Sequence, residues 1–174
     1  MSEATPIKFT IRSFEPRDAV ACRRLYEEGL IGGRIAENDT AADIDDIPVA
    51  YMNSGGSHFF VAETDKREIV GMIGVQQHMP EEGEIRRLRV RTDCRRRGIG
   101  SGLLERAIRF CKEQQHLKVT LDTFIDREPA LRLFEKFGFK HTRTRDVSGK
   151  SLLYFYLDLY AGEREAPKRV KEKS

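Results

Sequence analysis

The sequence predicts a single α/β (α+β) domain in which helices pack against a mixed β-sheet. Short runs typical of strands occur on both sides of a strongly amphipathic helical segment at 98–115. Taken in order, the segments read β-α-α-β-β-β-α-β-α-β-β. The length of 174 residues suits one domain, and neither a Pro/Gly/Ser-rich linker nor an internal repeat supports a second. We therefore expect one domain over residues 1–162, followed by a flexible charged tail at 163–174.

The N-terminal half is predicted to contain a strand, two helices and a hairpin. Apolar residues recur at near-helical spacing behind Pro16, a residue that favours the start of a helix. Two apolar runs on either side of the turn sequence DKRE indicate the hairpin. The predicted ranges are 7–13 (strand), 18–30 (helix), 40–52 (a short helix), and 58–64 and 69–78 (the paired strands).

The C-terminal half contains the most periodic segment of the chain. Leu103, Leu104, Ala107 and Cys111 fall on one face of the predicted helix, and charged residues occupy the other face. Apolar and alternating runs before and after it indicate further strands. The predicted ranges are 84–91 (strand), 98–115 (helix), 117–123 (strand), 128–137 (helix), and 139–146 and 151–159 (strands).

Composition excludes several classes of protein. Hydrophobic residues make up 39% and charged residues 34%, an ordinary globular mix. No apolar run approaches the roughly 18 residues of a membrane span, and the N-terminus lacks the layout of a signal peptide. Three widely spaced cysteines predict no disulfide framework, so we expect a reduced, cytoplasmic setting. The four histidines show no metal-ligand spacing, so no metal site is expected.

Opposite charges are concentrated in two separate segments. Residues 84–97 contain seven arginines against Glu84 and Asp93, whereas residues 37–46 contain five acids and no base. The net charge of +3 by itself implies no partner. An arginine run of this kind allows a nucleic-acid-binding surface, but residues 84–104 contain none of the aromatic residues that such surfaces usually interleave.

A glycine-rich turn follows the strand at 84–91 and opens the helix at 98–115. Gly98, Gly100 and Gly102 let the backbone approach a ligand, and N–H groups of a first helical turn attract anions. Three arginines at 95–97 add cations where the helix dipole is already positive, which favours a ligand with several phosphates. A glycine-eased turn with solvated arginines is the alternative. Leu103 excludes both a Walker A loop and a GxGxxG fingerprint, because it stands where each requires a glycine.

These motifs together resemble the GNAT superfamily of acetyl-CoA-dependent N-acetyltransferases. The family's pyrophosphate loop reads Q/R-x-x-G-x-G/A, and RRRGIG at 95–100 matches every defined position. LRV at 88–90 resembles the family's L-x-V strand, and PALRLFEKFGF at 129–139 resembles its A-I/L-x-L-Y/F-E-K-x-G-F segment. The resemblance implies a GNAT-type, mostly antiparallel sheet and acetyl-CoA as co-substrate. It is firm over 84–140 and only architectural before that.

The resemblance also implies which residues bind acetyl-CoA. The backbone of the 88–90 strand would pair with the pantetheine arm, and the loop would hold the pyrophosphate. Arg127 stands where many members carry an asparagine that holds the pantetheine. The expected cofactor-binding residues are Leu88, Arg89, Val90, Arg95, Arg96, Arg97, Gly98, Ile99, Gly100, Ser101, Gly102, Arg127 and Phe134.

Glu84 is the expected catalytic base, because an amine must lose a proton before or during attack on a thioester. In members with a glutamate base, that residue lies eleven positions before the first residue of the loop motif, which here is Glu84. Regular alternation places it on the same face as Leu88 and Val90. A salt bridge to a neighbouring arginine is the alternative role. As a base its pKa must be raised by burial, whereas nearby arginines would lower it.

The group that protonates the departing CoA thiolate is left open. The family's usual tyrosine is replaced by Phe134, which cannot donate a proton. Tyr154 or Tyr156 would supply a hydroxyl, although aromatic residues in such a strand are more often core. A thiol with a pKa of roughly 8.5 also leaves without an acid. Resemblance implies a backbone N–H near Val90 as the oxyanion donor, and a covalent role for Cys94 is disfavoured because the family transfers directly.

The acceptor is expected to be a primary amine. The acidic stretch at 37–46 falls where the family's acceptor loop lies, which favours a cationic small molecule or a peptide amine; a solvated loop is the alternative. Two other functions remain: a catalytically silent CoA-binding sensor or scaffold, suggested by Phe134, and the less favoured nucleic-acid-binding module. Family members often form dimers, so a homodimer is compatible with the sequence.

Overall fold

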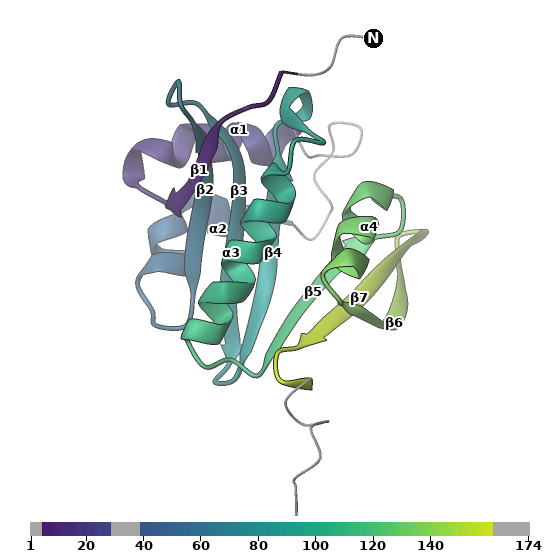
Figure 1. Cartoon of the computed structure of the whole chain (residues 1–174). Helices are drawn as coiled ribbons and strands as arrows, with labels where there is room; N and C mark the ends of the chain where they lie inside the picture. The colour runs from purple at the N-terminus through teal and green to yellow at the C-terminus, as the bar shows by residue number, and fades with distance from the viewer. Residues whose placement is uncertain (1–4, 29–38, 162–174) are drawn as a thin grey trace, which may run out of the picture.

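A computed structural model describes residues 5–28 and 39–161, and its elements follow the predicted order (Figure 1). The strands are β1 (Phe9–Ser13), β2 (His58–Thr64), β3 (Ile69–Met79), β4 (Glu82–Val90), β5 (Lys118–Phe124), β6 (Lys140–Val147) and β7 (Lys150–Asp158). The helices are α1 (Ala19–Glu28), α2 (Ala42–Asp45), α3 (Ile99–Glu113) and α4 (Glu128–Lys136), with single turns η1 (Pro16–Asp18), η3 (Pro48–Met52) and η4 (Thr92–Cys94).

The strands form one seven-stranded sheet in the order β1-β2-β3-β4-β5-β7-β6. The β4–β5 pair is parallel, and the other five pairs are antiparallel. The mixed, mostly antiparallel sheet predicted from the sequence is therefore confirmed.

Two hydrophobic cores lie on opposite faces of the sheet, and β2 contributes to both. Phe60 and Ala62 face the core under α3 and α4, whereas Phe59 and Val61 face the core under α1, α2 and η3. Figure 1 shows α3 and α4 on one side of the sheet and α1 and α2 on the other. We call these the α3 face and the α1 face.

The sheet opens between β4 and β5. The two strands pair only from Glu82 to Glu84 and from Lys118 to Thr120, although both continue well beyond those residues. Figure 1 shows them together at one end and apart at the other, below the start of α3. Above Glu84 the β4 edge is therefore not closed by a neighbouring strand among the described residues.

A β-bulge in β4 changes which side chains face each core. Gly74 pairs with Arg86 and Met72 pairs with Arg89, so β4 contains one residue more than β3 between these two pairs. Within this interval Arg87 adopts a φ of +57°. Leu88 packs on the α3 face. The prediction that Glu84 shares a face with Leu88 and Val90 is wrong, because the extra residue reverses the alternation. Glu84 lies on the α1 face.

Two predicted segments differ in detail. The single short helix expected over 40–52 is divided into α2 and the π-type turn η3 by Asp46, whose backbone is not helical. The expected tail at 163–174 lies outside the described residues, as do residues 29–30 of the first predicted helix and residues 37–38 of the acidic stretch. Among the described helices, none is long and apolar enough to cross a bilayer.

Candidate active site

The open edge of β4 presents a backbone donor to the gap. Arg91 N–H bonds to Val70 O at 2.8 Å, so beyond the bulge the hydrogen-bonded pairs of this antiparallel ladder fall at Arg89 and Arg91 of β4. Val90, opposite Gly71, is therefore a non-hydrogen-bonded pair, and its N–H points away from β3 toward the gap. This is the position at which the sequence predicted an oxyanion donor.

The start of α3 lies at the top of the same gap and has no side-chain cap. Gly98 occupies the N-cap position in the left-handed conformation, with a φ of +81° that an L-residue adopts only at a cost. Because glycine has no side chain, nothing at the N-cap accepts from the N–H groups of the first turn. Such a helix end suits an anion.

The other two glycines of the loop have different surroundings. A Cβ at Gly100 would lie 3.5 Å from Leu133 Cδ2 and 3.7 Å from Val90 Cγ2, so this backbone faces the gap between α3 and α4. A Cβ at Gly102 would lie 3.0 Å from Ile11 Cδ1, which shows that this glycine lets α3 pack closely on β1. Gly102 therefore serves helix packing, and Gly98 and Gly100 are the ones placed near the gap.

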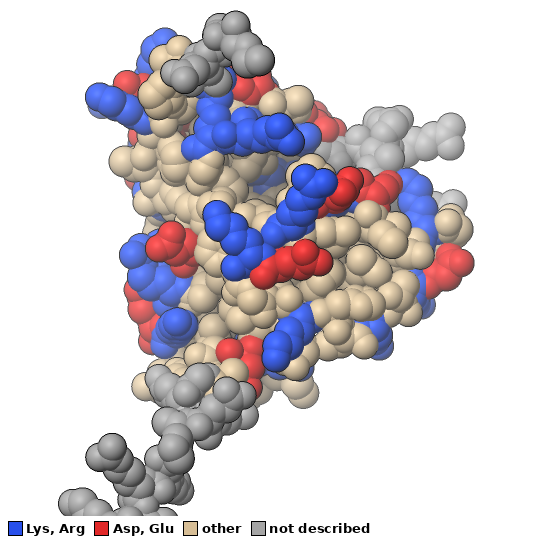
Figure 2. All heavy atoms as spheres, turned by 45° about the vertical axis from the view of Figure 1, so that its right-hand side comes forward, with Lys and Arg blue, Asp and Glu red and all other residues tan. Residues whose placement is uncertain are grey.

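Basic side chains surround this helix start. Arg95 and Arg96 are exposed, whereas Arg97 is half-buried and donates to Thr5 O at 2.5 Å. Arg127 occupies the N-cap position of α4 without a side-chain cap hydrogen bond, and burial, followed by the charge of Arg95, lowers its pKa. Figure 2 shows Lys and Arg side chains gathered at the upper end of this face, near the start of α3 in Figure 1.

Glu84 lies at the point where β4 and β5 separate. Its Oε2 is 2.5 Å from His78 Nε2, and its Oε1 is 3.7 Å from Arg86 Nε. Burial raises the pKa of Glu84 and outweighs the lowering effect of the His78 and Arg86 charges. The salt-bridge role is thus partly present, yet the raised pKa that a base requires is present too.

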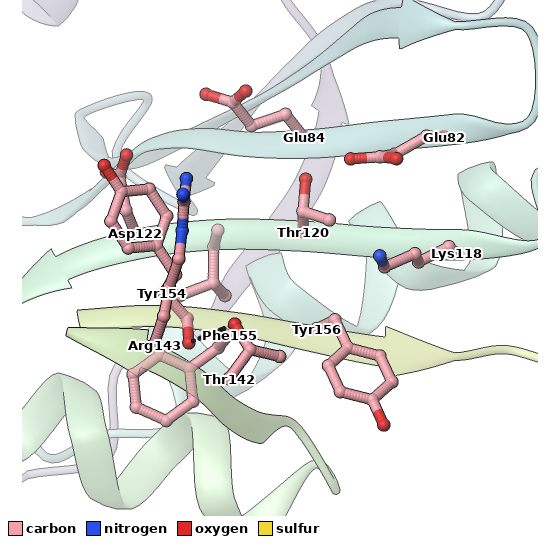
Figure 3. A pocket seen from close by; sticks show the side chains of 11 residues that line it. Glu82, Glu84, Lys118, Thr120, Asp122, Thr142, Arg143, Tyr154, Phe155 and Tyr156 are labelled. Carbon is pink, nitrogen blue, oxygen red and sulfur yellow. Dashed lines mark hydrogen bonds between the residues drawn. The ribbon is translucent and has the colours of Figure 1, made fainter.

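A cavity of about 300 Å³ adjoins Glu84, between β4, β5, β6 and β7 (Figure 3). Tyr154 and Tyr156 line it, while Phe155 between them also belongs to the core. The expectation that these tyrosines are core residues is therefore wrong, because β7 turns alternate side chains toward the cavity. The other lining residues are Glu82, Lys118, Thr120, Leu121, Asp122, Thr142 and Arg143.

Some predicted cofactor residues place their side chains in the core. Ile99 is 1% exposed and Phe134 is 4% exposed, and the Phe134 ring packs against Phe139 and Phe155. For Ile99 the backbone N–H is the group that faces the gap, as expected of a helix start. Burial raises the pKa of Cys94, which opposes a nucleophilic role.

The acidic stretch is divided: Asp45 and Asp46 are exposed, whereas Asp39 and Asp43 are held by an arginine. Asp39 and Asp43 each accept two hydrogen bonds from the Arg87 guanidinium, at distances between 2.6 and 2.9 Å. Arg87 also packs on the Tyr26 ring, 5.1 Å from its centroid. Two carboxylates that the sequence assigned to an acceptor are thus bound by an arginine from β4. The arginine run is correspondingly divided between the two faces of the sheet.

Sequence reasoning missed two residues near the gap. Asp122 lies on β5 beside the cavity and acts on the charge of Glu84, raising its pKa. The Arg89 side chain lies on the α1 face, where the sequence considered only its backbone. The sequence signal that could have identified Asp122 is a charged residue within the alternating polar and apolar residues of the strand predicted at 117–123. The bulge hid the orientation of Arg89.

A comparison with protein families assigns the chain. The model of the acetyltransferase (GNAT) family matches residues 21–139, which include most of α1, the open strand pair and the glycine loop. The chain belongs to the GNAT acetyltransferase family. The GNAT fold expected from the motifs is confirmed, and the open edge of β4 and the uncapped start of α3 are read as parts of that fold.

Curated relatives and solved structures agree with this assignment. The chain is 33% identical over 105 residues to human N-acetyltransferase 8, covering 58% of this chain and 46% of the relative. It is 31% identical over 133 residues to N-acetylaspartate synthetase of Rattus norvegicus, covering 75% of this chain and 44% of the relative. The chain thus spans about half the length of the curated relatives it matches.

Among solved structures, Ard1 from Thermoplasma volcanium is 26% identical with a TM-score of 0.73, covering 88% of this chain and 99% of that one. The structure of yncA from Salmonella typhimurium with its cofactor acetyl-CoA has a TM-score of 0.74 at 20% identity, covering 87% of this chain and 94% of that one. The second likeness shows the fold alone.

Among the described residues, no group of three or more metal-binding side chains is placed to hold an ion.

Proposed function

We propose that this GNAT protein transfers an acetyl group from acetyl-CoA to a primary amine by direct attack, with Glu84 as the general base. The observation that carries the proposal is the position of Glu84: it is the last residue of β4 that pairs with β5, beside the opening that Val90 N–H faces. Family membership and relatives named for N-acetylation support the same chemistry.

The residues at the gap fit a phosphorylated thioester. Acetyl-CoA supplies an activated acetyl group when bound. The first-turn N–H groups of α3 and the exposed Arg95 and Arg96 suit the phosphates, since the helix end is uncapped and electropositive. Gly98 keeps this end free of a Cβ. The backbone edge of β4 suits the amides of the pantetheine arm, because beyond Glu84 no strand in the described part of the chain pairs with it.

Proton transfer is the part that the side chains perform. An acceptor ammonium with a pKa near roughly 10 must lose a proton, and the Glu84 carboxylate accepts it directly or through water. His78, half-exposed and 2.5 Å from Glu84, gives that proton a route to solvent. Val90 N–H donates to the oxygen that becomes negative during attack. Tyr154 and Tyr156 at the cavity are the hydroxyls available to the leaving thiolate.

The proposal is tested first by thermal unfolding with acetyl-CoA, CoA, ATP or a short DNA duplex at matched concentration. A ligand at about 100 times its Kd raises the unfolding free energy by roughly 2.7 kcal/mol, which corresponds to about 5–10 °C here. We expect only the CoA species to raise the midpoint. A rise with DNA alone would instead support the nucleic-acid-binding module.

The second test compares Glu84→Gln with the exposed control Glu113→Gln on α3, by release of free CoA in the presence of an amine panel. We expect kcat/KM to fall about 10²- to 10⁴-fold for Glu84→Gln only, with the CoA-induced midpoint shift retained. Wild-type kcat/KM should decline as pH falls through the raised pKa of Glu84, and the variant should lack this limb. CoA binding without turnover in any variant would support the sensor.

A further inference from the structure

The Arg89 side chain lies at the gap and has no carboxylate partner among the described residues. Its Nε is out of contact with solvent and makes no hydrogen bond in that part of the chain. Its Nη1 donates to Leu88 O at 3.0 Å, a carbonyl of its own strand. A buried guanidinium nitrogen without an acceptor is costly, so the unmet Nε–H indicates a missing acceptor of hydrogen bonds.

The neighbourhood of Arg89 is strongly cationic. Loss of solvent, together with the charges of Arg127 and Arg87, lowers the pKa of Arg89 to about 10. The charge of Asp39 acts against this lowering, but both Asp39 oxygens already accept from Arg87, at 2.6 and 2.8 Å. An anion that enters this site would offset both the repulsion and the unmet donors.

The acetyl-CoA phosphates do not suit this role. Their proposed site is the start of α3, which packs on the α3 face of the sheet. Arg89 lies on the opposite face, because the bulge turns it toward Tyr26 and Asp39 of the α1 side. Glu84 lies on that same α1 face. The acceptor, which must approach the base, therefore also approaches Arg89.

We propose that the acceptor amine carries a carboxylate and that the Arg89 guanidinium binds it, with Arg127 adding positive charge beside it. Arginine presents two parallel N–H donors that match a carboxylate, and it does so best where water is excluded. Glu84 and Arg89 are separated by four or five strand steps of about 3.3 Å. This span accommodates two extended side chains with a small molecule between them, so the acceptor class is an amino acid.

This inference rests on the proposed function and refines it. It replaces the cationic acceptor that the acidic stretch suggested, because Asp39 and Asp43 are bound by Arg87 and are not available to an ammonium group. Glu84 then receives the amine, and Arg89 selects the acid attached to it.

The experiment measures CoA release by the full chain with matched acceptors: leucine, phenylalanine and aspartate, their C-terminal amides, a dipeptide with a free C-terminus, and spermidine. Wild type is compared with Arg89→Gln, Arg89→Lys and the exposed control Arg109→Gln on α3. Binding of acetyl-CoA and of N-acetyl amino acids is measured by calorimetry for the same proteins. Comparing the dipeptide with the free amino acids shows whether the carboxylate belongs to a free amino acid or to the C-terminus of a peptide.

We expect wild type to prefer at least one amino acid over its amide by about tenfold to a hundredfold in kcat/KM, mainly through KM. Arg89→Gln should remove this preference, Arg89→Lys should restore part of it, and acetyl-CoA affinity should change less than threefold. In the calorimetry, N-acetyl amino acids should bind wild type more tightly than Arg89→Gln.

Three outcomes would overturn the inference. Equal use of the acids and their amides would refute it while leaving acetyl transfer intact. A loss of acetyl-CoA affinity in Arg89→Gln equal to the loss of activity would assign Arg89 to the cofactor. Should no acceptor react, N-acetyl amino acids that bind wild type and Arg89→Gln equally would also refute it. Absence of CoA binding in wild type would refute the proposed function itself.

Discussion

Replacing Arg87 with methionine should destabilise the domain strongly at neutral pH. Arg87 is only 9% exposed, and its guanidinium holds Asp43, 10% exposed, and Asp39, 25% exposed. Removing the cation leaves two shielded carboxylates without this counter-charge, although Tyr51 O–H and Ala41 N–H still donate to them; such a change typically costs about 3–5 kcal/mol. Because Asp39 retains some solvent, we expect the lower end, about 3 kcal/mol. For a domain of this size the midpoint should fall by roughly 6–12 °C.

The loss should shrink in acid, and its sign follows from Asp39. Hydrogen bonds from Arg87 lower the pKa of Asp39 from 3.8 to about 2, so its stabilisation is complete above pH 3.8 and is lost as pH falls toward 2. That difference corresponds to roughly 2 kcal/mol. Wild type and Arg87→Met should therefore converge between pH 4 and pH 2.

Thermal unfolding and urea unfolding at pH 7, 4 and 3 measure the midpoint temperature and the unfolding free energy, with Arg109→Met as an exposed arginine control. Adding Asp39→Asn and Asp43→Asn to Arg87→Met should recover part of the stability, since the unpaired charges disappear. A midpoint within 2 °C of wild type at pH 7, or a loss that does not depend on pH, would refute the reasoning.

Two further substitutions test the packing. Phe134→Tyr should lower the midpoint by a few degrees without increasing kcat, because the new hydroxyl enters a core site that is 4% exposed and meets no partner there; an increase in kcat with unchanged stability would show instead that this position reaches the thiolate. Gly74→Ala should cost about 1–3 kcal/mol, because the added Cβ would lie 2.7 Å from Tyr51 Cε1. Gly55→Ala, where the same atom would meet nothing within 4 Å, is the matched control, and equal midpoints for these two variants would contradict the packing.

The order of the elements and the glycine loop could be predicted because their signals are local. Apolar residues recur at helical spacing along α3, and Gly98 is a glycine at the start of that helix, where the backbone is left-handed. Residue type and spacing were enough in both cases.

The faces of β4 could not be predicted in the same way. A strand that alternates regularly and one that contains a bulge have the same residues, and an arginine at a φ of +57° gives no signal in the sequence. What holds Arg87 there is its contact with Asp39 and Asp43, more than forty positions away. The choice between a core role and a hydroxyl role for Tyr154 and Tyr156 stays open in the sequence for a similar reason, because only the arrangement of β6 and β7 shows which residues of β7 meet a cavity.

The bulge in β4 also sets a counting rule for this strand. Between Glu84 and the loop at Arg95, the chain must contain one residue beyond what regular pairing with β3 requires. Deleting Arg87 would restore regular pairing with β3 and would leave Glu84 opposite Gln76 on the α1 face. The same deletion would remove the guanidinium that holds Asp39 and Asp43, so the extra residue serves the contact between β4 and that acidic segment, whereas the face of Glu84 is set by its pairing with Gln76.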